Sequence, residues 1–180
     1  MTNYTPTAKT FHWLIALLIF ITFPLGIYMH ELALSPIKIK LYSYHKWIGV
    51  SVFILTSARL LWRTTHQPPS LPGSLPQWQL RASFITHYAL YALLFFVPIS
   101  GWLMSSAKGV QTVWFGVLPL PDLVTRDEVM GDLLNNTHKI LNITLLILVT
   151  LHVLAGLKHY FIDRDKVMSR MLFIGRRKTP

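Results

Sequence analysis

The chain has 180 residues, of which 52% are hydrophobic and 13% are charged, a balance typical of membrane proteins rather than of soluble domains. It contains no cysteine, which excludes disulfides, iron–sulfur clusters, thiolate-bound zinc and covalently attached c-type haem. The net charge of +10 would indicate nucleic acid binding in a soluble protein, but in a membrane protein the placement of the charges matters more than their sum. We therefore expect no nucleic acid partner.

Four apolar stretches are long enough to cross a lipid bilayer, which takes about 20 helical residues with few charges. In chain order they cover residues 11–29, 46–62, 82–106 and 140–162. Arg59 interrupts the second stretch, but an arginine near a helix end can extend its charge to the interface, so we keep this stretch as a span. The sequence thus predicts an all-α, integral membrane four-helix bundle in which residues 1–180 form a single domain.

The segments that connect these spans are short, and the C-terminal tail, 163–180, is basic. Its apolar residues allow two interpretations, a short amphipathic helix on the membrane surface or a solvated tail. With a cytoplasmic N-terminus, eleven Lys and Arg residues fall on the cytoplasmic side and six on the other. Because cytoplasmic segments carry the excess of positive charge, we predict that both termini are cytoplasmic.

Eight histidines occur in this apolar chain, although an ionisable group inside a span is unfavourable unless it has a polar partner or a metal. His152 follows His138 by fourteen residues in the fourth span, which returns it to within about 40° of the same face and about 21 Å farther along the axis. His12 begins the first span at the depth of His152, and His45 begins the second at the depth of His138. The sequence predicts two pairs, His12 with His152 and His45 with His138.

Paired imidazoles fill both axial positions of a haem iron, so a site of this kind passes electrons and does not bind dioxygen or substrate. Two pairs at different depths predict two b-type haems and a path for electrons across the membrane. Zinc is the main alternative metal, but its structural sites use four ligands together, whereas these histidines separate into two pairs. A transporter or a structural bundle without a cofactor would leave the four matched histidines unexplained.

The fourteen-residue interval recurs in the other helices, where it relates a histidine to a residue at the opposite depth. The related residues are His12 and Gly26, His45 and Arg59, and His87 and Gly101. A glycine level with a haem lets the flat macrocycle pack against the backbone, as small residues do in membrane bundles. Arg59, at the level of the inner haem, is expected to pair with a propionate.

The residues that fix these positions resemble the bacterial cytochrome b561 family over nearly the whole chain. The matching residues are Phe11, His12, Trp13, Leu14, His45, Lys46, Ile48, Gly49, Arg59, Trp62, Arg63, His87, Tyr88, Leu90, Tyr91, Ser100, Gly101, Phe115, Gly116, His138, Leu151, His152, Lys158, His159, Phe161, Ile162 and Asp163. The resemblance implies a bacterial inner-membrane bundle with two haems b, held by the same four histidines, and we expect Gly49 among the haem contacts. It also implies an oxidoreductase that exchanges electrons with a membrane quinone, and at least one kind of member oxidises superoxide at the outer face while reducing ubiquinone at the inner face.

Two further sites are predicted with less specific residues. A quinone near the inner haem needs hydrogen-bond and proton donors, for which we propose His87, Lys158 and His159, the alternative being interfacial or packing histidines. A positive outer surface would attract a small anion such as superoxide, the alternative being contact with anionic lipid. The residues concerned are Lys38, Lys40, Lys46, Arg126 and Lys139.

Two functions fit these predictions. The first is a self-contained redox enzyme of the superoxide:quinone type, which moves electrons from an outer donor through two haems to quinone. The second is an electron relay, either the membrane cytochrome subunit of a dehydrogenase or hydrogenase or the donor to a periplasmic protein. The short connecting segments favour the first, because they contain no evident docking domain.

Overall fold

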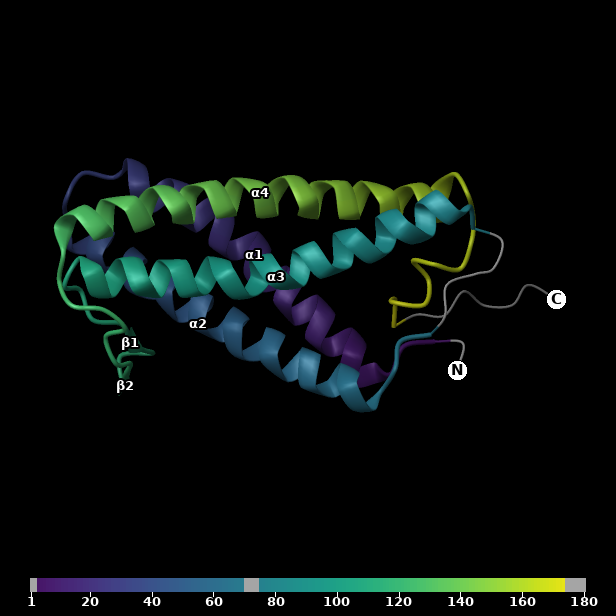
Figure 1. The fold of residues 1–180 in the computed structure, drawn as a ribbon, viewed down its shortest axis with the longest axis horizontal. Helices are drawn as coiled ribbons and strands as arrows, with labels where there is room; N and C mark the ends of the chain where they lie inside the picture. The colour runs from purple at the N-terminus through teal and green to yellow at the C-terminus, as the bar shows by residue number, and fades with distance from the viewer. Residues whose placement is uncertain (1–2, 70–74, 174–180) are drawn as a thin grey trace.

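Four long helices form a bundle in the computed structural model, which describes residues 3–69 and 75–173. They are α1 (Pro6–Glu31), α2 (Pro36–Thr65), α3 (Gln77–Ala107) and α4 (Glu128–Phe161). The helices alternate in direction, so α1 begins and α4 ends at the same end of the molecule (Figure 1). We call this the inner end and the opposite end the outer end. The predicted four-helix membrane bundle is confirmed.

Local capping explains where three of the helices begin. The side chains of Thr5, Ser35 and Asp127 accept hydrogen bonds from free backbone N–H groups in the first turns of α1, α2 and α4. A proline follows two of these caps, where its missing N–H has no helical partner to lose. Helix α4 therefore begins at Glu128, well before the apolar stretch that starts at residue 140, and extends beyond it at the outer end.

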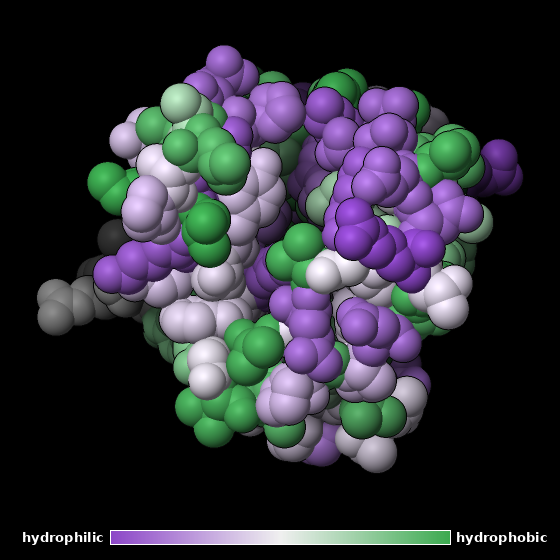
Figure 2. All heavy atoms as spheres, turned by 90° about the vertical axis from the view of Figure 1, so that its left-hand side faces the viewer, coloured by the Kyte–Doolittle hydropathy of each residue, from purple (hydrophilic) through white to green (hydrophobic). Residues whose placement is uncertain are grey.

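The outward-facing surface of the bundle is apolar. Helices α1, α3 and α4 are long and apolar enough to cross a membrane, and large side chains such as Phe20, Ile27 and Phe96 are more than half exposed. Water-soluble proteins rarely expose apolar surface on this scale, so these side chains face lipid. Figure 2, which views the outer end, shows hydrophilic side chains gathered over much of that end.

Helix α2 differs from the other three because it carries several cations, including Arg59 and Arg63, and it does not meet the same criterion for a membrane span. Its 30 residues nevertheless extend about 45 Å. It packs against α1 and α3, while α4 packs against α3. The second predicted span therefore lies on a helix long enough to cross the bilayer, although its composition alone does not identify it as one.

A layer of buried apolar side chains occupies the middle of the bundle. Its buried members are Ile15, Val52, Leu93, Leu94, Val97 and Leu145. Leu145 is seven residues from both His138 and His152, and seven residues are close to two helical turns, so all three lie on one face of α4. The layer thus separates the two levels at which the histidines lie.

A small β-hairpin covers the outer end of α2, which the all-α prediction did not include. Strands β1 (Val113–Trp114) and β2 (Leu118–Pro119) pair antiparallel, and Trp47 Nε1 donates to the Val113 carbonyl at 2.6 Å. Phe115 and Gly116 form the turn with positive φ angles of 50° and 72°, which the hairpin turn requires. The indole of Trp47 fixes the hairpin to the bundle.

The C-terminal segment folds back toward α1 at the inner end (Figure 1). Lys9 Nζ donates to the Leu172 carbonyl at 2.8 Å, and Trp13 Nε1 donates to the Met171 carbonyl at 3.0 Å. Residues 166–172 form turns and bends. Of the two interpretations of the tail, the amphipathic helix does not hold within residues 163–173, where turns and bends contact α1; residues 174–180 lie outside the described residues.

Candidate functional site

The outer histidine pair joins α2 to α4. The imidazole centroids of His45 and His138 lie 6.4 Å apart, with their planes at 82°. Both rings border a cavity of about 50 Å³ that Gly49 also lines. A Cβ atom added at Gly49 would meet no atom within 4 Å, so this glycine leaves open space beside the pair.

The inner pair joins α1 to α4. The imidazole centroids of His12 and His152 lie 6.2 Å apart, with their planes at 72°. Both rings are half-buried. A third histidine, His87 of α3, lies beside this pair, with its ring centroid 5.4 Å from that of His152. The Nδ1–H of His87 donates to the Ser83 carbonyl at 2.7 Å. The inner level thus contains one more imidazole than the predicted pair.

The separations within both pairs fit a metal held between two rings. The centre of an imidazole lies about 1.1 Å from each nitrogen, so two rings binding one metal at about 2.0–2.1 Å have centroids about 6.2–6.4 Å apart. The observed values are 6.2 Å and 6.4 Å. Two hydrogen-bonded imidazoles would lie closer, and unrelated rings need not share one distance. The residues present therefore fit an iron with two axial imidazoles at each level.

Gly26 and Gly101 both lie at the outer level, each against a histidine ring. A Cβ atom at Gly26 would lie 3.2 Å from Cε1 of His45, and one at Gly101 would lie 3.0 Å from Cε1 of His138. Both distances are shorter than ordinary carbon contacts. The contact partner is the imidazole, whereas the sequence analysis assigned these glycines to the flat face of the macrocycle.

Arg59 lies at the inner level, within electrostatic reach of His12, His87 and His152. Its guanidinium lies 5.3 Å from the centroid of the Tyr91 ring. Tyr4, which precedes α1, lies near the same guanidinium; burial raises the pKa of the Tyr4 phenol, and the neighbouring arginines oppose that rise. This end of the bundle thus gathers a cation and two phenols beside the inner pair.

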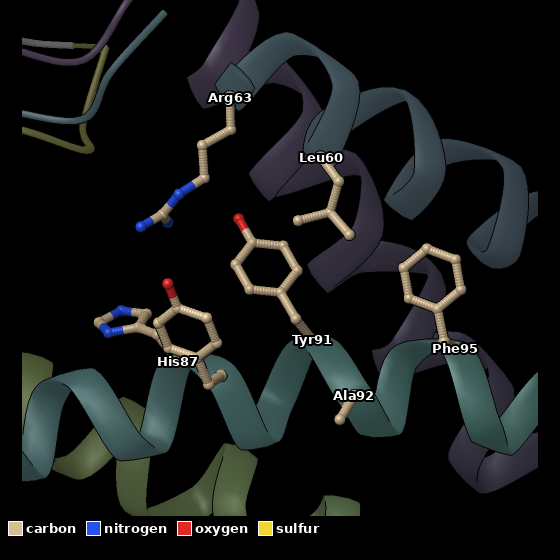
Figure 3. Close-up of a pocket in the computed structure, with 7 residues that line it drawn as sticks. Leu60, Arg63, His87, Tyr91, Ala92 and Phe95 are labelled. Atoms are coloured by element: carbon tan, nitrogen blue, oxygen red, sulfur yellow. The ribbon is translucent and has the colours of Figure 1, made fainter.

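A pocket of about 360 Å³ opens between α2 and α3 at the inner end. Arg63, His87 and Tyr91 direct their polar groups toward one end of it, while apolar side chains line the other end (Figure 3). The apolar residues are Leu60, Ala92 and Phe95. A cavity of this size with a few convergent polar groups suits an amphiphilic small molecule.

Lys158 and His159 do not line that pocket. Lys158 Nζ lies 2.6 Å from a carboxylate oxygen of Asp163, and His159 Nδ1 lies 2.6 Å from a carboxylate oxygen of Asp165. These contacts hold the start of the C-terminal segment against the end of α4. Of the three residues predicted for a quinone site, the structure brings His87 into the pocket and joins the other two to carboxylates.

The five predicted outer cations lie at the outer end, and three of them contact carbonyl or carboxylate oxygens. Lys38 donates to the His30 and Leu32 carbonyls, and Lys46 donates to the Val110 carbonyl. Arg126 pairs with Glu128 at 3.1 Å. The other two are Lys40, whose Nζ lies 5.8 Å from the Tyr44 ring, and Lys139, which is exposed.

Three residues that contact these groups, Arg63, Tyr91 and Ser100, had no role predicted from the sequence. Arg63 and Tyr91 follow Arg59 and His87 by four residues, and this spacing places each on the same helix face as the residue already chosen. That signal was sufficient to find them. Ser100 of α3 hydrogen-bonds to His138 of α4, and no local pattern predicts a contact between two helices.

Lipid-facing helices with paired imidazoles inside the bundle define a class of protein, the membrane cytochromes of b type. The family model for prokaryotic cytochrome b561 matches residues 3–173, so the chain belongs to the prokaryotic cytochrome b561 family. Membership confirms the resemblance seen in the sequence and implies binding of b-type haem and electron transfer in the membrane.

Curated relatives agree with this assignment. "Cytochrome b561 homolog 2" of Escherichia coli (strain K12) is 34% identical over 172 residues, covering 94% of this chain and 91% of that protein. "Cytochrome b561 homolog 1" of the same organism is 24% identical and covers 96% of this chain and 98% of that protein. "Probable superoxide oxidase CybB" of Yersinia pestis is 25% identical, covering 89% and 90%.

Proposed function

We propose that the protein carries electrons across the bacterial inner membrane through two b-type haems, one held by His45 and His138 and the other by His12 and His152. The observation that carries the proposal is the pair of centroid separations, 6.4 Å and 6.2 Å, which match one metal between two imidazoles. When bound, the haems would supply one-electron oxidation and reduction at two depths.

The chain's own residues would restrict the site to this chemistry. His45 with His138, and His12 with His152, would hold the two irons and leave no position for dioxygen or substrate, so the bound groups would supply electron transfer alone. The buried layer around Ile15, Val52 and Leu145 excludes water between the two levels. Electrons can cross such a layer by tunnelling, but protons need a hydrogen-bonded chain, so the layer supports electron transfer without proton leakage.

We propose that both termini lie in the cytoplasm, on the basis of the eleven positive residues against six. An outer donor would then deliver electrons near His45 and His138, and a quinone would accept them at the inner end. The name of the Yersinia pestis relative supports superoxide as the donor. The reaction balances as follows. Two superoxide anions each lose one electron and become two dioxygen molecules, and one quinone gains the two electrons and two protons and becomes a quinol.

The pocket between α2 and α3 is the proposed quinone site. His87 lies at its polar end and 5.4 Å from His152, close enough to accept a quinone head beside the inner pair. Its Nδ1–H donates to the Ser83 carbonyl, so Nε2 can donate to a quinone oxygen when the imidazole is protonated and can accept from a quinol hydroxyl when it is neutral. In this proposal Lys158 and His159 do not contact the quinone. Their contacts with Asp163 and Asp165 hold the C-terminal segment against the end of α4.

The remaining predicted residues are proposed to contact the haem groups or to attract an anionic donor. Arg59, beside the inner pair, would pair with a propionate, and Gly49, beside the outer pair, leaves room for the macrocycle. At the outer end, the exposed Lys139 with Lys40 would contribute most to attraction of an anion, because Lys38, Lys46 and Arg126 already bind carbonyl or carboxylate oxygens.

A redox titration of the purified protein, followed by optical spectroscopy, tests the central claim. We expect two b-type components, and fewer than two would refute the proposal. Addition of superoxide and a short-chain quinone to the same protein then tests the activity. Quinol formation supports the self-contained enzyme, whereas haem reduction without quinol formation, together with a co-purifying soluble subunit, would favour the electron relay.

A further inference from the structure

Helix α3 supplies none of the four proposed ligands, yet its residues 97–101 enclose the imidazole of His138. Val97 and Ser100 are buried, with 9% and 5% of their surface exposed. Gly101 lies against the ring at Cε1, where an added Cβ would approach to 3.0 Å. One short stretch of α3 therefore contacts the Nδ1–Cε1 edge of a ring that belongs to α4.

Two oxygens of this stretch accept hydrogen bonds from the ring. His138 Nδ1 lies 2.9 Å from Ser100 Oγ and 3.1 Å from the Val97 carbonyl oxygen. Ser100 Oγ itself donates to the Val97 carbonyl at 2.8 Å, so its lone pairs face Nδ1 and its proton does not. The only assignment that fits all three contacts places the proton of the neutral imidazole on Nδ1, which leaves the Nε2 lone pair free.

The other three proposed ligands lack this arrangement. The Thr22 carbonyl interacts with the His45 ring, but Nδ1 of His45 makes no hydrogen bond of normal geometry within the described residues. Among residues 3–69 and 75–173, no hydrogen bond is made by a ring nitrogen of His12 or His152. The difference singles out His138 as the ligand whose orientation and tautomer are fixed by a neighbouring side chain.

We propose that Ser100 is a positioning residue that fixes the His138 ring and lowers the reduction potential of the outer haem. This inference rests on the proposed ligation by His138. A hydrogen bond from Nδ1–H to an acceptor makes the imidazole a stronger base toward its metal. A stronger base stabilises ferric over ferrous iron, so loss of the Ser100 hydroxyl, which leaves Nδ1–H with the more distant Val97 carbonyl alone, raises the potential.

The test is a redox titration of the haem-loaded Ser100→Ala protein. Removing the hydrogen-bond partner of a metal-bound histidine typically costs about 10- to 100-fold in metal affinity or activity, and we take the low end of this range for the preference for ferric over ferrous iron. At a fixed ambient potential we therefore expect the ratio of reduced to oxidised outer haem to rise about tenfold, equivalent to 59 mV for a one-electron couple. The component missing from His45→Ala identifies the outer haem, and the inner component should not move.

Electron paramagnetic resonance gives a second readout that does not depend on activity. The anisotropy of the low-spin ferric signal depends on the angle between the two imidazole planes, which is 82° at the outer pair. We expect the outer signal to change in Ser100→Ala because the ring gains freedom to rotate. Ser57→Ala is the matched control, since Ser57 Oγ makes the same kind of bond to the Phe53 carbonyl, and it should leave both signals unchanged.

The Ser100→Thr variant separates the effect of hydrogen bonding from that of packing. The threonine hydroxyl can still donate to the Val97 carbonyl in the preceding turn, as Ser100 does. We expect the potential of this variant to stay close to the original value. Two haems with an unchanged outer potential in Ser100→Ala would overturn the inference, as would an equal shift in Ser100→Thr. Fewer than two haems in the unmodified protein would instead refute the proposed function.

Discussion

The two ends of the bundle contain similar histidine pairs, but the residues around each pair differ. At the outer end, glycine backbone and a buried serine contact the rings of His45 and His138 directly. At the inner end, a third imidazole, two arginines and a pocket of about 360 Å³ lie beside His12 and His152. The outer pair thus has close backbone and serine contacts and borders only a small cavity of about 50 Å³, whereas the larger pocket at the inner end is reached through His87, which lies against His152.

This contrast agrees with different tasks for the two levels. A site that only receives one electron at a time needs fixed ligands and no large adjoining pocket, because reorganisation slows electron transfer. A site that reduces quinone must admit a bulky molecule and deliver protons, so it needs a pocket and polar groups. The same helix, α4, provides one ligand to each pair, and the difference arises from what α1, α2 and α3 place beside them.

The largest expected effect comes from removing one ligand of each pair in turn. His138→Ala should remove the outer haem and leave the inner one, whereas His12→Ala should do the reverse, and each variant should lose roughly half of the haem absorbance. Optical spectra at controlled potential measure this directly. His66→Ala is the control, because His66 stacks on Trp62 at the end of α2. Loss of both components in each single variant would show that the two levels are not independent sites.

His87→Phe should slow quinone reduction at the inner end while both haems stay bound. If His87 donates a hydrogen bond or proton to the quinone, its loss should slow quinone reduction by roughly 10²-fold, the lower range for general acid–base groups. Reduction of the outer haem by a donor should be unaffected. Quinol formation and haem reduction are measured on the same preparation. Undiminished quinone reduction with both haems present would remove His87 from the site.

Gly101→Ala should disturb the outer pair alone. The new Cβ would lie 3.0 Å from Cε1 of His138, and overpacking of this kind costs about 1–3 kcal/mol, or roughly 5- to 150-fold in retention of the outer haem. Haem loss to an acceptor such as apomyoglobin measures the effect. Gly156→Ala is a matched control on α4, because an added Cβ there meets no atom within 4 Å. Equal haem loss from both variants would contradict the assigned contact.

Periodicity and hydropathy were sufficient to predict the bundle and the depth of each histidine. The fourteen-residue interval between His138 and His152 depends only on helix geometry, and the structure keeps both residues in one unbroken helix. Hydropathy was least informative for α2, where Arg59 and Arg63 reduce the apolar signal. These arginines face Tyr91 of α3, so their position depends on tertiary packing that a single helix does not reveal.

Two features that were missed, the hairpin and the course of the C-terminal segment, depend on contacts between distant segments. The hairpin at Val113–Trp114 has strands of two residues and is held by Trp47 from another helix. Residues 163–173 do not form the amphipathic helix that was one of two interpretations of the tail, and Lys9 and Trp13 bind carbonyls of this segment. Local propensity cannot anticipate either arrangement, because the stabilising partner lies more than sixty residues away in each case.

Ionic strength should have a smaller effect, and it should change only the rate of the reaction at the outer end. Screening shortens from about 30 Å at 0.01 M salt to about 10 Å at 0.1 M, so attraction of an anionic donor to the outer end should weaken, while reduction of a neutral quinone at the inner end should not change. We expect a several-fold decrease in the rate of haem reduction by superoxide, near the low end of the 10–10³ range for steering. Carboxylates such as Glu128 and Asp132 already pair with outer cations and reduce the field.

Charge removal at single positions sharpens the same test. Lys139→Gln should reproduce part of the salt effect, because Lys139 is exposed and makes no ion pair within the described part of the chain. Arg81→Gln, at the inner end of α3, should have none. Stopped-flow measurement of haem reduction at two salt concentrations compares the variants. A rate that is independent of both salt and Lys139 would mean that the outer cations bind lipid and loop carbonyls and that superoxide reaches the outer haem by unassisted diffusion.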